Sequence, residues 1–340
     1  MTAPRRTTLT DVARLAGVSV GTASNVLNNK GRHTAATRQR VMWAAAEMHF
    51  SPNALIRSLQ RGRTNTVGVF TWRLHQAEWR DIALAILQGI SRTLSQKGMD
   101  VLLYARHPHE TLVDPSAFLD GRVDGVILAP GGVNADGARA LARANLPTVM
   151  LYEDPPEPSI ASVTIDNRAG ITAAVDHLVR LGHRRIGYVS PLYSYDFRQR
   201  YDTYRDRLET HGIVPDRRWS ATDVVDTDAY YDAVVTRLLC QEAPPTAIIA
   251  GNDGIALGLL TDLARRRVRI PGDVSVIGFD DSMKAAEARL TTVRQPAEDL
   301  GSCAGRMMLG LLNSDIALER RVELPVTFVA RETTGPPSFG

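Results

Sequence analysis

The chain has 340 residues, of which 44% are apolar and 23% are charged, so it is long enough for two or three domains with a large buried core. The formal net charge is +3, but residues 1–65 carry ten Lys or Arg against Asp11 and Glu47, a net charge of +8 that leaves residues 66–340 near −5. A cationic segment on a mildly acidic body favours nucleic acid as the partner.

The composition argues against several other classes of protein. Cys240 and Cys303 lie far apart without the spacing of metal ligands, so we expect neither a disulfide framework nor a zinc site. No uninterrupted apolar stretch approaches the roughly 18 residues of a membrane span. The basic N-terminus also lacks the apolar segment of an export signal. We therefore expect a cytoplasmic protein.

Residues 9–28 predict two short helices joined by a tight turn. Apolar residues recur at spacings of three and four: Leu9, Val12, Ala13 and Ala16 in the first helix, and Ala23, Val26 and Leu27 in the second. Thr8 and Ser19 suit the N-caps, and Gly17 suits the end of the first helix, where glycine adopts a left-handed conformation at least cost. This pattern is typical of a helix-turn-helix, which lays its second helix in the major groove of DNA.

Two further helices are predicted before residue 66. The first runs from Thr34 to about His49 and completes a small three-helix core. The second begins near Pro52 and ends at Gly62, because proline favours the first turn of a helix and glycine favours its end. A helix of so few turns is marginal alone in water, so we expect it to form only against a partner.

From Thr66 onward, short β-branched runs alternate with helical stretches. The predicted strands are residues 66–71, 100–105, 124–129, 148–152, 185–190, 246–250 and 274–278. The predicted helices include residues 79–97, 168–181, 198–211, 230–239, 254–266 and 297–312. This alternation is typical of α/β folds with doubly wound parallel sheets. The pattern restarts near residues 182–187, which favours two similar lobes over a single sheet.

A series of short motifs runs along nearly the whole chain. In order they are LTDVARLAGVS at 9–19, SPNALIRSL at 51–59, VDGVI at 123–127, VTIDN at 163–167, HL at 177–178, GHRRI at 182–186, ND at 252–253, PGDVSVIGFDD at 271–281, LTTV at 290–293 and RE at 331–332. Each motif alone is weak. In this order they resemble the LacI/GalR (lactose repressor) family of bacterial transcription regulators.

The resemblance implies an all-α headpiece attached to a two-lobed core. A helix-turn-helix headpiece would span residues 1–50, and a hinge helix with its linker would span residues 51–65. Residues 66–340 would form an effector-binding and dimerisation core similar to periplasmic sugar-binding proteins, with a small molecule between its lobes. The N-lobe would hold about 66–164 and 293–320, and the C-lobe about 165–292 and 321–332, so the chain would cross between lobes near 164, 292 and 320.

The resemblance also places residues that would contact DNA. Val20, Gly21 and Asn25 would read base edges from the start of the second helix. Polar residues suited to phosphates complete the headpiece set: Thr10, Ser19, Thr22, Ser24, Asn28, Arg32, Thr34 and Thr37. Without the motif, these hydroxyls would be read as plain polar surface. Gly21 departs from the side-chain-bearing residue usual in the family, so Asn25, which can pair with adenine, would carry more of the discrimination.

On the hinge helix, Asn53, Ala54, Arg57 and Leu59 are expected to contact DNA. Family members insert this leucine into the minor groove, and the resulting kink costs on the order of a few kcal/mol. The alternative is that Leu55 and Leu59 pack helix against helix across a dimer. Two hinge helices, one from each subunit, would fold only side by side in the groove, so DNA affinity would depend on the spacing of the lobes above them. A ligand would change that spacing, and with it the affinity, by binding one of the two conformations more tightly than the other.

In the core, Arg200, Asn252 and Asp280 match polar positions that face the ligand in this family, and open α/β sheets bind ligands at such strand ends. The fork of an arginine suits hydroxyls or a carboxylate. Further candidates for the effector site are Trp72, Arg73, Trp79, Tyr152 and Phe197. The alternatives are ordinary structural roles such as a capped strand-end turn for Asn252 and Asp280, and simple lobe surface for Trp72, Arg73 and Trp79.

Catalytic chemistry is poorly supported. Asp280 and Asp281 are neighbours at a strand end, where side chains point apart, and no nucleophile or base motif accompanies them. No glycine-rich phosphate loop follows a strand, and the histidines lack metal-ligand spacing. We expect no enzymatic activity, no cofactor and no metal.

Together the patterns predict a ligand-responsive transcription repressor. A homodimer would bind a pseudo-palindromic operator in double-stranded DNA, and a small metabolite, such as a sugar or related compound, would change its affinity. Only eight residues follow Glu332, too few for the heptad-bearing tail that makes some relatives tetramers, which favours a dimer. The alternative is a small-molecule (sugar) binding protein without DNA function.

Overall fold

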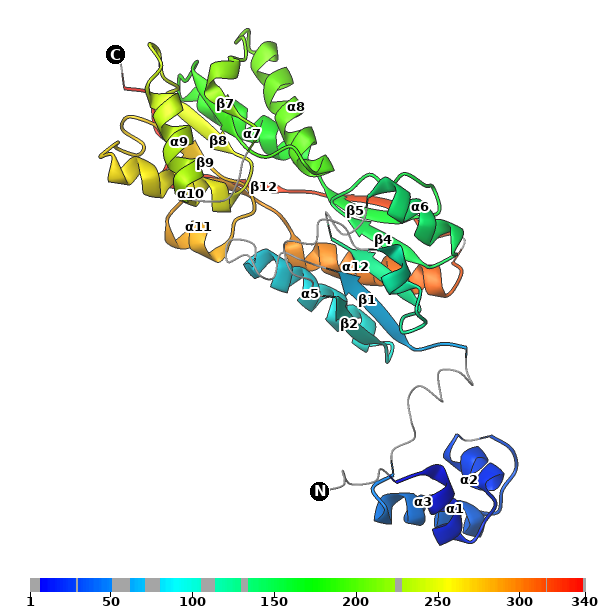
Figure 1. Cartoon of the computed structure of the whole chain (residues 1–340). Coiled ribbons are helices and arrows are strands. Elements are labelled where there is room, and N and C mark those ends of the chain that lie inside the picture. The colour runs from blue at the N-terminus through cyan, green and yellow to red at the C-terminus, as the bar shows by residue number, and fades with distance from the viewer. Residues whose placement is uncertain are drawn as a thin grey trace. The chain divides into compact units, whose positions relative to one another are not determined.

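The computed structural model describes residues 7–28, 30–50, 62–70, 80–104, 114–129, 134–223, 228–315 and 317–338. They fall into two units, Met1–Thr64 and Asn65–Gly340, whose elements are labelled in Figure 1. Within these described ranges, no helix is long and apolar enough to cross a membrane.

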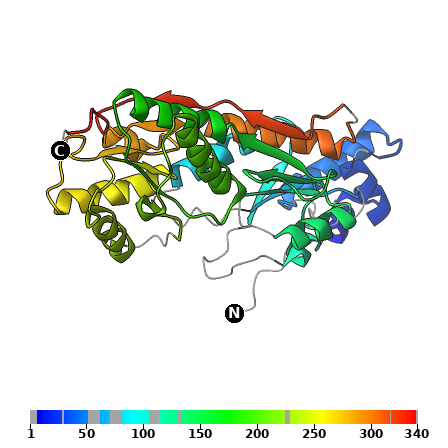
Figure 2. The same cartoon turned by 90° about the horizontal axis from the view of Figure 1, so that it is seen from above.

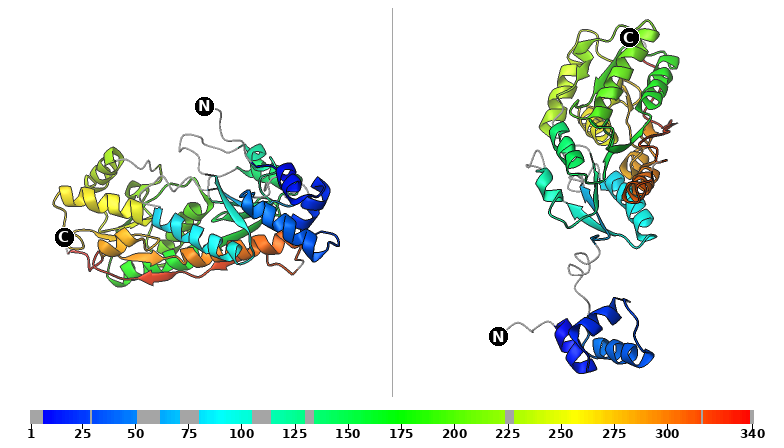
Figure 3. Two further views of the ribbon diagram at one scale, coloured as in Figure 1. Left: turned by 90° about the horizontal axis from the view of Figure 1, so that it is seen from below. Right: turned by 90° about the vertical axis from the view of Figure 1, so that its right-hand side faces the viewer.

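The described part of the first unit contains the helices α1 (Leu9–Ala16), α2 (Val20–Leu27) and α3 (Ala35–Glu47), seen in the right-hand view of Figure 3. Each helix begins at a hydroxyl cap whose side chain accepts a backbone N–H of the first turn. Gly17 ends α1 with a φ of 64°, in the left-handed region. The helices bury a small apolar core of Val12, Ala13, Ala16, Ala23, Val26, Val41, Ala44 and Ala45. The predicted helix-turn-helix is therefore confirmed.

The second unit begins with a parallel sheet in the order β11-β5-β4-β3-β1-β2, which we call the N-lobe sheet. Its strands are β1 (Thr66–Phe70), β2 (Asp100–Tyr104), β3 (Gly125–Leu128), β4 (Thr148–Leu151), β5 (Ala161–Ile165) and β11 (Arg321–Leu324). The helices of this lobe are α5 (Arg80–Ser95), η2 (Pro115–Phe118), α6 (Ala135–Arg143) and α12 (Ala297–Leu312). A Cβ on Gly301 of α12 would lie 2.0 Å from the Ile86 carbonyl oxygen of α5, so glycine permits this close approach of the two helices.

The C-lobe sheet is also parallel and has the order β7-β6-β8-β9. Its strands are β6 (Ile186–Val189), β7 (Ser220–Ala221), β8 (Ala247–Ala250) and β9 (Ser275–Ile277). Its helices are α7 (Asn167–Arg180), α8 (Tyr195–Thr210), η3 (Arg217–Trp219), α9 (Asp228–Leu239), α10 (Asp253–Arg265) and α11 (Met283–Glu287). Ile249 packs with α7 and α8, whereas its neighbour Ile248 packs with α9 and α10, because successive strand residues face opposite sides. The predicted doubly wound α/β architecture is confirmed.

Three connections join the lobes. The chain leaves the N-lobe sheet after β5, returns through β10 (Thr292–Arg294) into α12, and leaves again from β11 into β12 (Thr327–Val329). β10 and β12 pair antiparallel, and Figure 2 shows the C-terminal strands running along both lobes. The sequence predicts the third crossing near residue 320. The structure places it after Leu324, because residues 321–324 form an edge strand that pairs with β5.

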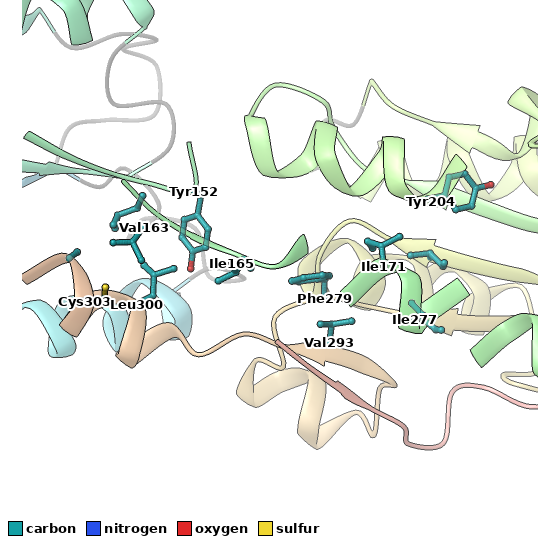
Figure 4. Packing of buried hydrophobic residues seen from close by; sticks show 14 of the residues in the cluster. Tyr152, Val163, Ile165, Ile171, Tyr204, Ile277, Phe279, Val293, Leu300 and Cys303 are labelled. Carbon is teal, nitrogen blue, oxygen red and sulfur yellow. The ribbon is translucent and has the colours of Figure 1, made fainter. Parts of the chain in front are cut away.

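One apolar cluster continues through both lobes (Figure 4). Tyr152 and Ile165 enter it from the N-lobe, and Phe279 and Val293 enter it from the C-lobe and the crossing strand. A Cβ on Gly170 would lie 2.9 Å from the Phe279 ring, so the glycine lets this ring pack directly on α7. The lobes therefore share a buried core at their connection.

Candidate functional site

The start of α2 presents an exposed face. Val20 is 43% exposed, although Ala23, one turn later, is fully buried. Gly21 and Asn25 are exposed as well, and the Asn25 amide makes no hydrogen bond to another described residue. An unengaged amide on an exposed helix is able to make a bidentate contact with a base edge.

The hydroxyls at the starts of α2 and α3 act as helix caps. Ser19 Oγ accepts from the Thr22 backbone N–H at 3.1 Å and lies 2.9 Å from Thr22 Oγ1. Thr34 makes the same pair of contacts with Thr37, at 3.2 and 2.9 Å. The first N–H groups of each helix have no acceptor within the helix, so these two helix starts can still bind phosphate.

The remaining headpiece candidates lie beside these helix starts. Asn28 Nδ2 donates to the Ser24 carbonyl oxygen at 2.9 Å, which fixes the end of α2. Thr10 on α1 and Arg32 before α3 are exposed. The structure thus leaves Thr10 and Arg32 accessible, and it uses Ser24 and Asn28 partly for local structure.

Several predicted site residues lie outside the described residues. They include most of the predicted hinge helix, with Asn53, Ala54, Arg57 and Leu59, and the N-lobe candidates Trp72, Arg73 and Trp79.

Arg200 lies in the first half of α8, and its side chain is 1% exposed. Its Nε donates to Asn167 Oδ1 at 2.7 Å, and one terminal nitrogen donates to the Gly251 carbonyl oxygen at 2.6 Å. The other terminal nitrogen lies 3.3 Å from a carboxylate oxygen of buried Asp196. A buried guanidinium needs such compensation, and here protein groups supply it.

Two further C-lobe candidates are largely engaged by the protein itself. Phe197 is fully buried, with its ring centroid 5.4 Å from the Arg200 guanidinium. Asn252 is 3% exposed, and its Oδ1 caps α10 by accepting from the Ile255 N–H at 2.7 Å. The Phe197 ring therefore packs near the Arg200 guanidinium, and Asn252 keeps its Nδ2 group for a ligand.

Tyr152 and Asp280 are joined across the lobes by Gln295. The Tyr152 hydroxyl donates to Gln295 Oε1 at 2.5 Å, and Gln295 Nε2 donates to Asp280 Oδ1 at 2.6 Å. Tyr152 and Asp280 both have positive φ, 58° and 125°, which is costly for residues other than glycine. Sequence reasoning missed Gln295, and its only signal was its place two residues after the LTTV motif. All three side chains converge at the connection between the lobes.

The neighbouring acids Asp253 and Asp281 serve structural contacts. Asp253 accepts from the Thr292 hydroxyl at 2.6 Å and from the Ser282 N–H at 2.7 Å, and burial raises its pKa to about 6. Asp281 pairs with Arg294 at 2.6 Å and with Arg331 at 2.5 Å. Asp280 and Asp281 thus face different partners, which argues against a catalytic pair.

Comparisons with known proteins identify both units. Residues 8–53 match the family model of bacterial regulatory proteins of the lacI family, and residues 175–334 match the periplasmic binding protein-like domain. The HTH-type transcriptional regulator DegA of Bacillus subtilis (strain 168) is 30% identical, with 97% of this chain and 99% of that protein covered.

Solved structures give the same result. A lac repressor dimer bound to operator and the anti-inducer ONPF matches with a TM-score of 0.82 and 27% identity, covering 97% of this chain and 100% of that chain. The complex of the transcriptional regulator CelR with cellobiose matches with a TM-score of 0.71 and 29% identity, covering 96% and 100%. The similarity extends over both units of the chain.

Proposed function

The chain belongs to the LacI family of bacterial regulatory proteins, and on that premise we propose a repressor whose affinity for operator DNA is set by a small molecule bound between the lobes of its core. The single observation that carries the DNA-binding half is the match of a family model to residues 8–53, where α2 presents its exposed face. The alternative, a binding protein without DNA function, is not favoured.

On the DNA side, we assign the headpiece to residues 1–50 and the hinge helix with its linker to residues 51–65. Val20 and Asn25 would select the operator sequence through contacts to base edges, and Gly21 would allow the backbone to lie close to the groove. The helix starts at Ser19 and Thr34, together with Arg32, would bind phosphates, and Leu59 would enter the minor groove from the hinge.

On the effector side, we assign the ligand to the cleft beside Arg200, Asn252 and Asp280. The N-lobe would contribute Tyr152, Trp72, Arg73 and Trp79, and Phe197 would hold the arginine in place. The CelR complex with cellobiose supports a sugar or a related compound as the ligand class. Closure of the cleft would alter the contacts of Gln295 with Tyr152 and Asp280. This change in the connection between the lobes would be transmitted to the hinge helix.

We further propose that the protein acts as a homodimer in the cytoplasm. The matched lac repressor is a dimer on its operator, and a two-fold protein fits a two-fold site. Access to chromosomal DNA requires a cytoplasmic location.

The effector assignment is tested by a thermal-shift screen of sugars, sugar phosphates and nucleosides on the wild type and on Arg200→Ala. We expect one class of compound to raise the melting temperature of the wild type and to leave that of the variant unchanged. A hit that stabilises both proteins equally would refute the placement of the ligand at Arg200.

A further inference from the structure

A hollow of 480 Å³ lies on the C-lobe between α7 and α8, and we call it the α7–α8 groove. Arg168 on α7 and Arg198, Gln199, Asp202 and Asp206 on α8 are among the residues that line it. Its size falls within the range of small-molecule sites. Arg200 does not line this hollow, and its side chain is buried in the lobe interior.

The groove carries charges of both signs that the protein does not pair. Among the described residues, none of Arg168, Arg198, Asp202 and Asp206 takes part in an ion pair within 4 Å. Within the described part of the chain, the Arg198 guanidinium donates to the Leu192 carbonyl oxygen alone, at 3.1 Å. The contrast is Arg207 in the same groove, whose Nε and Nη2 both donate to Asp176 at 2.7 Å. The groove therefore presents two arginines at one end and two carboxylates farther along α8, none of them in an ion pair within 4 Å with a described residue, although Arg168 lies close enough to Glu323 to offset part of the rise that burial causes in the pKa of that carboxyl.

The spacing of these charges defines a ligand class. Arg198 and Asp202 are four residues apart on α8, about 6 Å along the axis, and Arg198 and Asp206 are eight apart, about 12 Å. An extended tripeptide spans about 10 Å. We propose that the α7–α8 groove is a second ligand site, which binds a short peptide-like zwitterion with its carboxylate on the arginines and its ammonium on the aspartates.

A chain of hydrogen bonds links this groove to Arg200. Gln199 Nε2 donates to the Tyr195 hydroxyl oxygen at 3.3 Å, and Gln199 Oε1 accepts from Asn167 Nδ2 at 3.0 Å. Asn167 Oδ1 in turn accepts from Arg200 Nε at 2.7 Å. Because arginine only donates, it fixes the direction of both amides. A ligand that engages Gln199 therefore acts on the partner of Arg200, and this regulatory step rests on the function proposed above.

Binding is tested by calorimetry on the full chain with triglycine. We expect one site per chain, and at least about tenfold weaker binding for N-acetyl-triglycine, for triglycine amide, and for triglycine with Arg198→Gln or Asp202→Asn. Arg205→Gln is the matched control, because Arg205 is exposed on the same helix but outside the groove lining. No binding with a Kd below about 1 mM, or equal binding by the Arg198 and Arg205 variants, would overturn the site.

The link to Arg200 has its own readout. We expect saturating triglycine to change the Kd for operator DNA by about fivefold or more. Asn167→Ala is expected to abolish that change while triglycine still binds. Triglycine binding without any change in operator affinity would overturn the link. A chain that binds triglycine but no operator would instead contradict the proposed function, so the two failures are distinguishable.

Discussion

The guanidinium carbon of Arg200 lies 3.7 Å from the centre of the Phe279 ring. A desolvated cation over an aromatic face gains about 2 kcal/mol or more, and the same guanidinium neutralises buried Asp196. We expect Arg200→Met to lower the free energy of unfolding by about 3–5 kcal/mol, because it leaves the carboxylate buried without a counter-charge. Urea unfolding measures this loss. The double variant with Asp196→Asn should recover part of it, and an unchanged loss would contradict the compensation.

Gln295 should stabilise the connection between the lobes. Gln295→Met removes the acceptor of the Tyr152 hydroxyl and the donor to Asp280, so we expect a loss of about 2 kcal/mol in the free energy of unfolding. Gln241→Met is the matched control, since Gln241 follows the end of α9 and its amide donates to the nearby Arg237 carbonyl oxygen at 2.8 Å, and it should stay within about 0.5 kcal/mol of the wild type.

The same relay predicts coupling between residues far apart in the sequence. In a double-mutant cycle of Gln295→Met with Tyr152→Phe, we expect an interaction energy of about 0.5–3 kcal/mol. Strictly additive losses would mean that the two side chains do not act together.

Asp253 should make stability depend on pH. Burial raises its pKa to about 6 in the folded state, against about 3.9 in the unfolded chain. The folded state therefore binds more protons between these values, and this group's contribution to the free energy of unfolding falls as pH rises from about 4 to 6, by up to about 3 kcal/mol. Comparing urea unfolding of wild type and Asp253→Asn across this range isolates the effect. Parallel pH profiles for the two proteins would refute it.

In the headpiece, Asn25 and Arg32 should affect DNA binding differently. Asn25→Ala removes the amide that we propose contacts base edges, so we expect specific affinity to fall by about 1–3 kcal/mol while non-specific affinity is kept. Arg32→Gln should weaken specific and non-specific binding to the same extent. It should also lower the slope of the logarithm of the affinity against the logarithm of the salt concentration by about one. Fluorescence anisotropy on operator and on random duplex measures both. A uniform loss for Asn25→Ala would remove it from the base-reading set.

Features that depend on interactions between residues close in the sequence could be predicted from the sequence, whereas features that depend on distant residues could not. The headpiece helices follow from local signals, because Thr8, Ser19 and Gly17 act within one turn of their own helices. The role of Gln295 could not be read in this way, since its partner Tyr152 is 143 residues away.

The proposed effector site shows the same limit. The family resemblance singled out Arg200 on a predicted helix that the structure contains as α8, but its partners Asn167 and Gly251 lie 33 and 51 residues away and come together only in the fold. The third lobe crossing was misplaced for a related reason. Residues 321–324 form an edge strand only because β5 is there to pair with them.

The proposed function is tested most directly by selecting a random duplex library with the full-length protein and measuring anisotropy on the enriched sequence at a fixed salt concentration. We expect enrichment of a two-fold symmetric site, bound about 10³-fold or more tightly than random duplex. Asn25→Ala should reduce that ratio. Enrichment of no symmetric sequence, with equal affinity for all duplexes, would contradict the proposed function.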